Sequence, residues 1–218
     1  MEVGIVEDIA PNETIWSARF IGDRGYLVTF ENVDPLWVLD LSNPLDPQIL
    51  GELEIPGVST YIHPVDDDHL LTIGIGPGDE GIGLDWSTTQ VSLFDVSDPS
   101  NPVLSDIEVL SPGYVDENCD EIRSCGWSWS WSEASYEHKA FTYWGPEEML
   151  AVPLSTYRYN WENNGGSYTH NYEYVSTLKM INVDVENESL SLHGTANHSD
   201  FYNVCLLYTS PSPRDVEE

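Results

Sequence analysis

A repeated Tyr-x-His motif is the first candidate for chemistry in this sequence. The motif occurs at residues 61–63 and 136–138, in corresponding places of two similar stretches. In an extended strand, side chains alternate between two faces, so the tyrosine and the histidine of each copy would share one face. Imidazole and carboxylate groups can bind a metal ion or polarise a bound molecule. The candidate ligand-binding residues are Tyr61, His63, Glu133, Tyr136, Glu137 and His138.

This set has two interpretations. If the histidines and glutamates of the two copies converge, they could act as acid, base or metal-binding groups of a hydrolase or lyase. The alternative is that the histidines form hydrogen bonds between neighbouring repeats in a packed structure. The identity of any metal is left open, because two histidines so far apart in sequence define no coordination geometry.

Three tryptophans alternate with serines in the segment GWSWSWSE. As a strand, this segment would place all three indoles on one face. Such a row could stack on the flat faces of sugar rings, or it could be the hydrophobic foot of an insertion folded over the rest of the chain. The candidate stacking residues are Trp127, Trp129 and Trp131.

Acidic loops at residues 66–68, 79–85 and 116–121 are a further source of ligands. Carboxylate oxygens are the ligands that calcium prefers, so calcium is the one ion that the sequence suggests. None of the loops has the spacing of an EF-hand, and solvated acidic loops are the alternative. No cofactor is identified, because the chain has no GxSxG, HExxH, P-loop or dinucleotide-binding motif.

The charge balance limits the classes of partner. The chain of 218 residues has 38 acidic and 7 basic residues, with a formal net charge of −31. A surface of this charge repels nucleic acid and anionic lipid, so neither is an expected partner. The acidity fits a halophilic or marine protein, whose self-repulsion is screened by salt, and equally an ordinary acidic secreted protein. No apolar stretch is long enough to predict a membrane span.

The elements that must position these residues repeat along the chain. Residues 36–56 and 91–110 share an apolar strand, a turn of Asp, Ser, Asn and Pro, and an alternating strand, and residues 178–194 are a weaker third copy. Asp40 and Asp95 end the apolar strands, where their carboxylates could accept hydrogen bonds from backbone N–H groups two residues on. Two further β-rich segments precede each copy, which predicts four strands per unit of roughly 50 residues.

This pattern predicts an all-β fold of the β-propeller type, with about three four-stranded blades. The predicted blades are approximately residues 12–57, 58–113 and 131–198, with insertions at 114–130 and 155–173. Propellers typically have about four to eight blades, so residues 1–204 are predicted to be a partial domain from a truncated ring.

Residues 205–218 are predicted to be a non-native tail. Back-translation of the segment CLLYTSPSPRD, at residues 205–215, matches a transposase adapter used in sequencing libraries. The reading frame is therefore expected to leave natural sequence near Val204.

Several stretches carry a family resemblance. Residues 17–30, 34–64, 88–104 and 131–144 resemble secreted bacterial and archaeal proteins that have a C-terminal β-propeller domain. The resemblance implies an extracellular or cell-surface location and no assigned reaction. In that setting, Cys119 and Cys125 are expected to form a disulfide.

The expected function is therefore an extracellular binding or scaffold domain, with an extracellular protein or a polysaccharide as its partner. The alternative is a propeller hydrolase or lyase whose site lies at the mouth of the central channel. That site would use His63, His138, Glu133 and Glu137.

Overall fold

The chain folds as a series of antiparallel sheets in a computed structural model, which describes residues 4–7, 9–30, 34–78, 83–110 and 124–197. Sheet 1 contains β1 (Thr14–Ile21), β2 (Arg24–Phe30), β3 (Asp34–Asp40) and β4 (Gln48–Ile55). Sheet 2 contains β5 (Val58–Pro64), β6 (His69–Pro77), β7 (Leu84–Asp95) and β8 (Val103–Leu110). In both sheets the strands pair in sequence order. The prediction of an all-β fold is confirmed.

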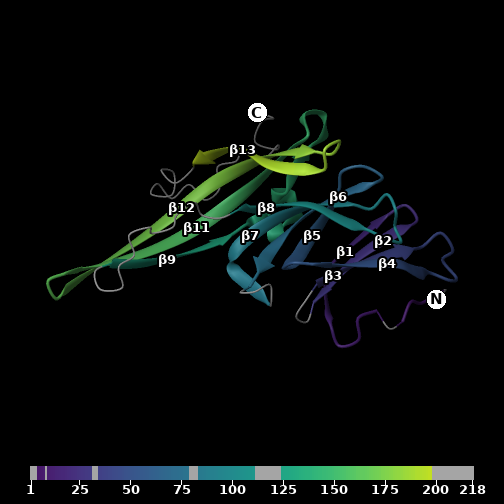
Figure 1. Ribbon diagram of the computed structural model, residues 1–218, viewed down its shortest axis with the longest axis horizontal. Coiled ribbons are helices and arrows are strands. Elements are labelled where there is room, and N and C mark those ends of the chain that lie inside the picture. Colours follow the sequence, from purple (N-terminus) through teal and green to yellow (C-terminus); the bar gives the residue numbers. More distant parts are fainter. Residues whose placement is uncertain (1–3, 8, 31–33, 79–82, 111–123, 198–218) are drawn as a thin grey trace, which may run out of the picture.

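Sheet 3 has an additional strand. It is built from β10 (Thr142–Trp144), β11 (Met149–Asn164), β12 (Ser167–Asp184) and β13 (Ser189–Asn197), and β9 (Ser124–Trp131) also pairs with β11. Strand β10 pairs with the first residues of β11, whereas β9 pairs with its later part at residues 155–162. The far halves of β11 and β12 and strand β9 therefore form a three-stranded extension, which we call the arm (β9 with residues 155–176). Figure 1 shows the arm projecting away from sheets 1 and 2.

The turns that join the strands use aspartate side chains in the predicted way. The Asp40 carboxylate accepts a hydrogen bond from the backbone N–H of Ser42 at 2.8 Å, and the Asp95 carboxylate accepts one from Ser97 at 2.8 Å. These hydrogen bonds fix the chain reversal between the third and fourth strands of sheets 1 and 2. Hydrogen bonds to the ionised carboxylates lower the pKa values of both aspartates. For Asp95 the hydrogen bond from the Ser97 side chain has the larger effect and that from its backbone N–H the smaller, whereas for Asp40 the backbone N–H of Ser42 has the larger effect.

Two apolar clusters hold the three sheets together face to face. One lies between sheets 1 and 2, and its fully buried members include Val28, Leu36, Val38 and Phe94. The other lies between sheets 2 and 3. Because sheet 2 is covered on both faces, its strands β6 and β7 have runs of consecutive buried residues, at 70–74 and 89–94, instead of alternating burial. The second cluster comprises Leu71, Ile73, Val91, Leu93, Leu110, Ala134, Phe141, Leu150, Val152, Leu154, Ile181, Val183 and Leu190.

One of the β-rich segments ahead of the third copy is a much shorter strand than expected. Residues 134–144 were expected to be extended, but the structure has two single-turn 3-10 helices, Glu133–Ser135 and His138–Ala140, before the short strand β10. The side chain of Ser132 accepts a hydrogen bond from Ala134 N at 3.2 Å, and that of Glu137 accepts one from Lys139 N at 3.2 Å. These caps favour a turn over an extended backbone.

Candidate functional site: an aromatic face on the arm

The first Tyr-x-His motif lies on β5 and makes aromatic contacts with sheet 3. The Tyr61 hydroxyl is 3.5 Å from Nδ1 of His63. The ring centroid of Phe141 lies 5.1 Å from that of Tyr61 and 5.3 Å from that of His63, and the ring of Tyr143 lies 5.7 Å from His63. Burial, and secondarily the charge of Arg19, lowers the pKa of His63. The neutral imidazole is therefore favoured within this cluster.

The second Tyr-x-His motif differs from the first in backbone conformation, and the ligand-binding role of these residues stays a prediction. Because residues 133–140 form turns, Tyr136 is 73% exposed, and Nδ1 of His138 lies 3.6 Å from the Glu137 carboxylate on the surface. The sheet 3 residues whose rings contact His63 are Phe141 and Tyr143. Glu133 belongs to the first turn and is partly buried.

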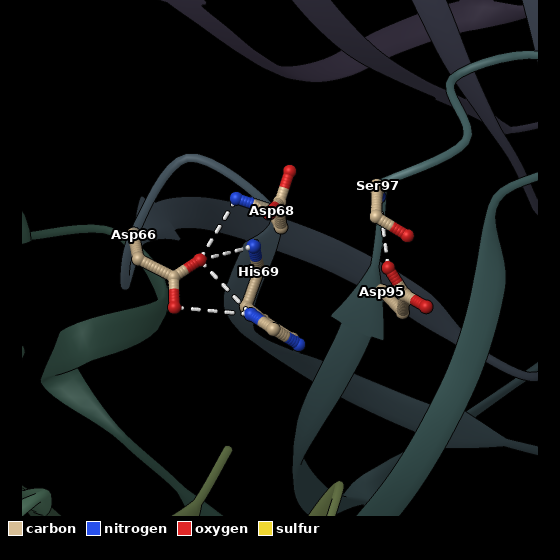
Figure 2. A network of polar contacts seen from close by, with 5 residues as sticks. All are labelled: Asp66, Asp68, His69, Asp95 and Ser97. Carbon is tan, nitrogen blue, oxygen red and sulfur yellow. Dashed lines mark hydrogen bonds and ion pairs between the residues drawn. The ribbon is translucent and has the colours of Figure 1, made fainter. Parts of the chain in front are cut away.

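The Asp66 carboxylate forms hydrogen bonds with the backbone of its own turn (Figure 2). The Asp66 carboxylate accepts hydrogen bonds from the N–H groups of Asp68 and His69, at 2.8 and 2.7 Å, and its oxygens lie 2.9 and 3.0 Å from Nδ1 of His69. Within the described part of the chain, no three His, Cys, Asp or Glu side chains gather in a way that could hold a metal. Calcium binding stays a prediction.

The arm carries aromatic side chains along one face. In an antiparallel pair, residues directly opposite each other project to the same side. Tyr157 of β11 pairs with Trp129 of β9 and Tyr174 of β12, while Tyr159 pairs with Trp127 and Tyr172. The same register adds Trp131, Trp161 and His170 to this side. We call this surface the aromatic face; its described members are Trp129, Trp131, Tyr157, Tyr159, Trp161, Tyr168, His170, Tyr172 and Tyr174.

Contacts between rings run along the whole aromatic face. From the root of the arm outward, ring centroids are separated by 5.3 Å (Trp129 and Trp131), 5.8 Å (Trp131 and Tyr174), 5.9 Å (Tyr157 and Tyr172) and 4.9 Å (Tyr159 and Tyr172). At the tip, Trp161 and Tyr168 are 5.7 Å apart. The rings contact one another and remain accessible: Trp129, Tyr168 and Tyr172 are 46%, 58% and 59% exposed.

The opposite side of the arm is polar. It carries Thr169, Asn171 and Glu173 on β12, and the guanidinium of Arg158 lies 3.3 Å from the Glu173 carboxylate. Nearer the sheet 2 core, the hydroxyls of Ser130 and Thr156 lie 3.0 Å apart. Apart from the buried Val175 at its inner end, the arm is thus a ribbon with aromatic residues on one side and polar residues on the other.

The aromatic surface continues from the arm onto the neighbouring sheets. The indole N–H of Trp129 donates a hydrogen bond to the backbone carbonyl of Trp86 at the start of β7. The Trp86 ring is 58% exposed and lies 6.1 Å from the Trp16 ring on β1. Trp16, Trp86 and Trp129 therefore connect all three sheets through one aromatic series.

Sequence reasoning identified only the β9 part of this surface. Trp129 and Trp131 lie side by side as expected, and Trp127 stands in register with Tyr159. The β11 and β12 residues were missed, although their alternation in STYRYNW and YTHNYEY was a usable signal. Cys125 stands in register with Trp161, whereas Cys119 lies outside the described residues, so their disulfide stays a prediction.

Three consecutive antiparallel sheets, two with four strands and one with five, pack face to face and define an all-β repeat protein with an exposed aromatic surface. The chain belongs to the β-propeller domain family, since the model of the beta propeller domain matches residues 1–214. The match runs past Val204, and residues 198–218 lie outside the described part, so the adapter origin of residues 205–218 stays a prediction.

Two similar proteins are uncharacterized and come from archaea. One, from Methanocaldococcus jannaschii, is 35% identical over 157 residues, which cover 72% of this chain and 21% of the relative. The other, from Archaeoglobus fulgidus, is 43% identical over 100 residues, which cover 46% of this chain and 15% of the relative. The chain thus spans about a fifth of these relatives or less.

A solved structure, a hypothetical selenium-binding protein from Sulfolobus tokodaii, is similar with a TM-score of 0.27 and 9% identity, covering 79% of this chain and 59% of that one. No helix in the described ranges is long and apolar enough to cross a membrane.

Proposed function

We propose that this chain is part of an extracellular or cell-surface β-propeller that binds an extracellular polymer, either a polysaccharide or a protein, through the aromatic face of its arm. The observation that carries the proposal is the accessible row of Trp and Tyr rings on β9, β11 and β12. Exposed aromatic residues gathered on one surface are typical of binding sites, since burying such rings against a partner yields a large gain per residue. The sheets below them act as a rigid scaffold.

In this proposal, the three sheets are consecutive blades of a ring that has further blades. Support comes from the way in which each outer strand meets the following sheet. The last strand of each sheet (β4, β8 and β13), which we call its outer strand, pairs with the strand before it with a shift in register. The outer-strand residue next to this shift is Gly51 in β4, Asp106 in β8 and Gly194 in β13. An added Cβ on Gly51 would lie 2.5 Å from the carbonyl oxygen of Pro99 in sheet 2, and the Asp106 carboxylate accepts a hydrogen bond from Leu190 N in sheet 3 at 2.7 Å.

At the third equivalent position, Gly194, no following sheet among the described residues packs against the outer strand. A Cβ on Gly194 would meet, of the described atoms within 4 Å, only the terminal carbon of Met180 at 3.5 Å. Strand partners of the first two positions, Val38 and Leu93, are fully buried, whereas Met180 is only partly buried. Trp144 lies on this same side of sheet 3 and is 60% exposed. A further blade packed on this side would bury these residues as sheets 2 and 3 bury the earlier ones.

An extracellular location is supported by two observations. The net charge of −31 keeps a protein soluble in saline media, where a short Debye length screens its self-repulsion. The sequence stretches that resemble secreted propeller proteins lie within the three sheets. The same charge opposes binding to nucleic acid.

The proposal is tested by sedimentation of the 218-residue protein with an insoluble cell-envelope fraction of Archaeoglobus fulgidus, the source of one relative. We expect the wild-type protein to sediment with the envelopes and the double variant Tyr168→Ala/Tyr172→Ala to remain in solution. The control is Thr169→Ala/Asn171→Ala, which alters the polar side of the same strand and should sediment like the wild type. Sedimentation that is absent, or equal for all three proteins, would contradict a binding role for the aromatic face.

A further inference from the structure

The composition of the aromatic face identifies the class of its partner. At its described positions, the face consists of Trp, Tyr and His, with Ser155 and Ser176 at its root, and it has no aliphatic side chain. The two apolar clusters between the sheets are the opposite, since most of their members are Leu, Ile and Val. Protein–protein interfaces also enrich aromatic residues, but together with Met and Arg, and their buried centres are more apolar; at its described positions this face has neither Met nor Arg, because Arg158 lies on the polar side. We propose that the aromatic face binds an uncharged polysaccharide chain.

Flat rings with polar edges match the chemistry of a sugar. Each pyranose ring has patches of C–H groups that pack on an aromatic face, and hydroxyls around its rim that need hydrogen-bond partners. Tyrosine and tryptophan supply both features, because each has an apolar ring and a polar O–H or N–H group. A row of such residues can therefore bind a polysaccharide without the deep pocket that a small ligand requires.

The length of the aromatic face suits a chain, not a single sugar. Along β12, the face extends from Tyr174 to Tyr168, and six residues of strand at ~3.3 Å each span about 20 Å. Neighbouring ring centroids along this path are 4.9 to 5.9 Å apart. Several consecutive sugar units would thus each find a ring, and the contacts would add along the chain.

The rings are held in place before a ligand arrives. The Tyr159 hydroxyl is 2.7 Å from Nδ1 of His170, and the two rings stack with an interplanar angle of 21°. The Tyr174 hydroxyl donates a hydrogen bond to the Ser155 hydroxyl at 2.8 Å. Side chains fixed in this way lose little conformational entropy on binding, which favours a weak, repetitive ligand such as a polysaccharide.

Charge restricts the polysaccharide to an uncharged one. The protein has a formal net charge of −31, and the only Lys or Arg in the described part of the arm, Arg158, lies on the polar side beside Glu173. Uronate or sulfate groups would be repelled by this field. Stacking on rings involves no net charge, so binding should persist when salt screens the protein.

The inference rests on the proposed function and is tested by affinity electrophoresis in native gels. The probes are hydroxyethyl cellulose, xyloglucan and galactomannan as uncharged chains, and alginate as an anionic chain. We expect at least one uncharged polysaccharide to retard the 218-residue protein, equally with and without 0.5 M NaCl (about 4 Å of Debye length), and alginate to have no such effect.

Matched variants locate the contact. We expect Tyr172→Ala to weaken retardation about tenfold, since one stacking contact is lost, and Tyr172→Phe to stay within about threefold of the wild type because the ring remains. Asn171→Ala, on the polar side, should be unchanged. Equal melting temperatures would show that each variant is folded.

Three outcomes are distinguishable. Retardation that Tyr172→Ala removes supports the inference. A second outcome is that no uncharged probe retards the protein, while the envelopes bind it in a way that depends on Tyr168 and Tyr172. If protease treatment of the envelopes then abolishes this binding, the partner is a protein. In that case the inference is wrong and the proposed function stands. If neither gels nor envelopes depend on these tyrosines, both are wrong.

Discussion

The close approach of sheet 1 to the turn between β7 and β8 of sheet 2 makes Gly51 a sensitive position. An added Cβ would lie 2.5 Å from the carbonyl oxygen of Pro99 and 3.0 Å from the carbonyl carbon of Ser100. Both are backbone atoms, which cannot swing away as the end of a flexible side chain can. Substitution Gly51→Ala therefore requires either the turn or β4 to move by a large fraction of an ångström.

The expected cost follows from two opposing effects. Overpacking of this kind typically destabilises by about 1–3 kcal/mol. Replacing a glycine whose backbone conformation suits alanine stabilises by about 0.4–1 kcal/mol, because the unfolded chain loses freedom. Gly194→Ala is the matched control, since Gly194 occupies the equivalent outer-strand position and its added Cβ would meet only Met180 Cε at 3.5 Å among the described atoms. We expect Gly51→Ala to be destabilised and Gly194→Ala to be unchanged or slightly stabilised.

Urea denaturation followed by tryptophan fluorescence measures both variants. For a chain of this length, 1 kcal/mol corresponds to roughly 2–4 °C in melting temperature, so thermal unfolding should separate the variants by several degrees. Equal stabilities for Gly51→Ala and Gly194→Ala would refute the close packing of β4 on the Pro99 turn. In a longer protein that includes a following blade, Gly194→Ala should acquire a cost similar to that of Gly51→Ala.

Three further predictions concern the contacts between sheets and the turns. Leu93 is fully buried between sheets 2 and 3, so Leu93→Ala should lower the free energy of unfolding by about 2–5 kcal/mol in urea titrations, and a loss below about 1 kcal/mol would contradict this packing. Burial, and then the charge of Asp106, raises the pKa of Glu108, so its ionisation is disfavoured in the folded state. Glu108→Gln should therefore gain stability relative to wild type as the pH rises from about 4 to 7, and a gain confined to acid pH would be inconsistent with the raised pKa. Hydrogen bonds from Ser97 lower the pKa of Asp95, so the stability they supply is present above the ordinary pKa of 3.8 and is lost as the pH falls through the lower folded value. Asp95→Asn should accordingly lose less stability than wild type between about pH 5 and 2, as followed by circular dichroism.

Much of the fold was predictable because the repeated turn has a local cause. An aspartate that accepts hydrogen bonds two residues on gives the same sequence signature wherever the turn recurs, as at Asp40 and Asp95. The apolar run before each of these turns then specifies a buried strand, and the alternating segment after it specifies a partly exposed strand. The segment at residues 133–140 was misassigned because its alternating pattern resembles a strand, while the capping side chains of Ser132 and Glu137 favour turns. Here local hydrogen bonds prevailed over periodicity.

The candidate site was only partly predictable. The Trp-Ser alternation signalled a one-sided strand at β9, but the partners of that strand depend on register, which one sequence does not specify. The pairing of β11 with both β9 and β12, as at Tyr157 with Trp129 and Tyr174, brings three separate aromatic segments to one face. The second Tyr-x-His motif was misleading for the converse reason: its resemblance to residues 61–63 was real in sequence but had no counterpart in backbone conformation.

The residues that hold the sheets together and the residues of the aromatic face lie in different parts of β11 and β12. This separation explains how the chain can carry a binding surface with little effect on its stability. Strands β11 and β12 have 16 and 18 residues, whereas the strands of sheet 1 have 7 or 8. The first part of β11 contributes Leu150 and Val152 to the cluster with sheet 2, and the last part of β12 contributes Ile181, whereas residues 155–176 contribute nothing to that cluster. Substitutions on the extension therefore leave the buried contacts between sheets intact, while the continuous hydrogen-bond ladder keeps the aromatic rings on a rigid element. A surface built in this way can change its ligand without refolding its scaffold.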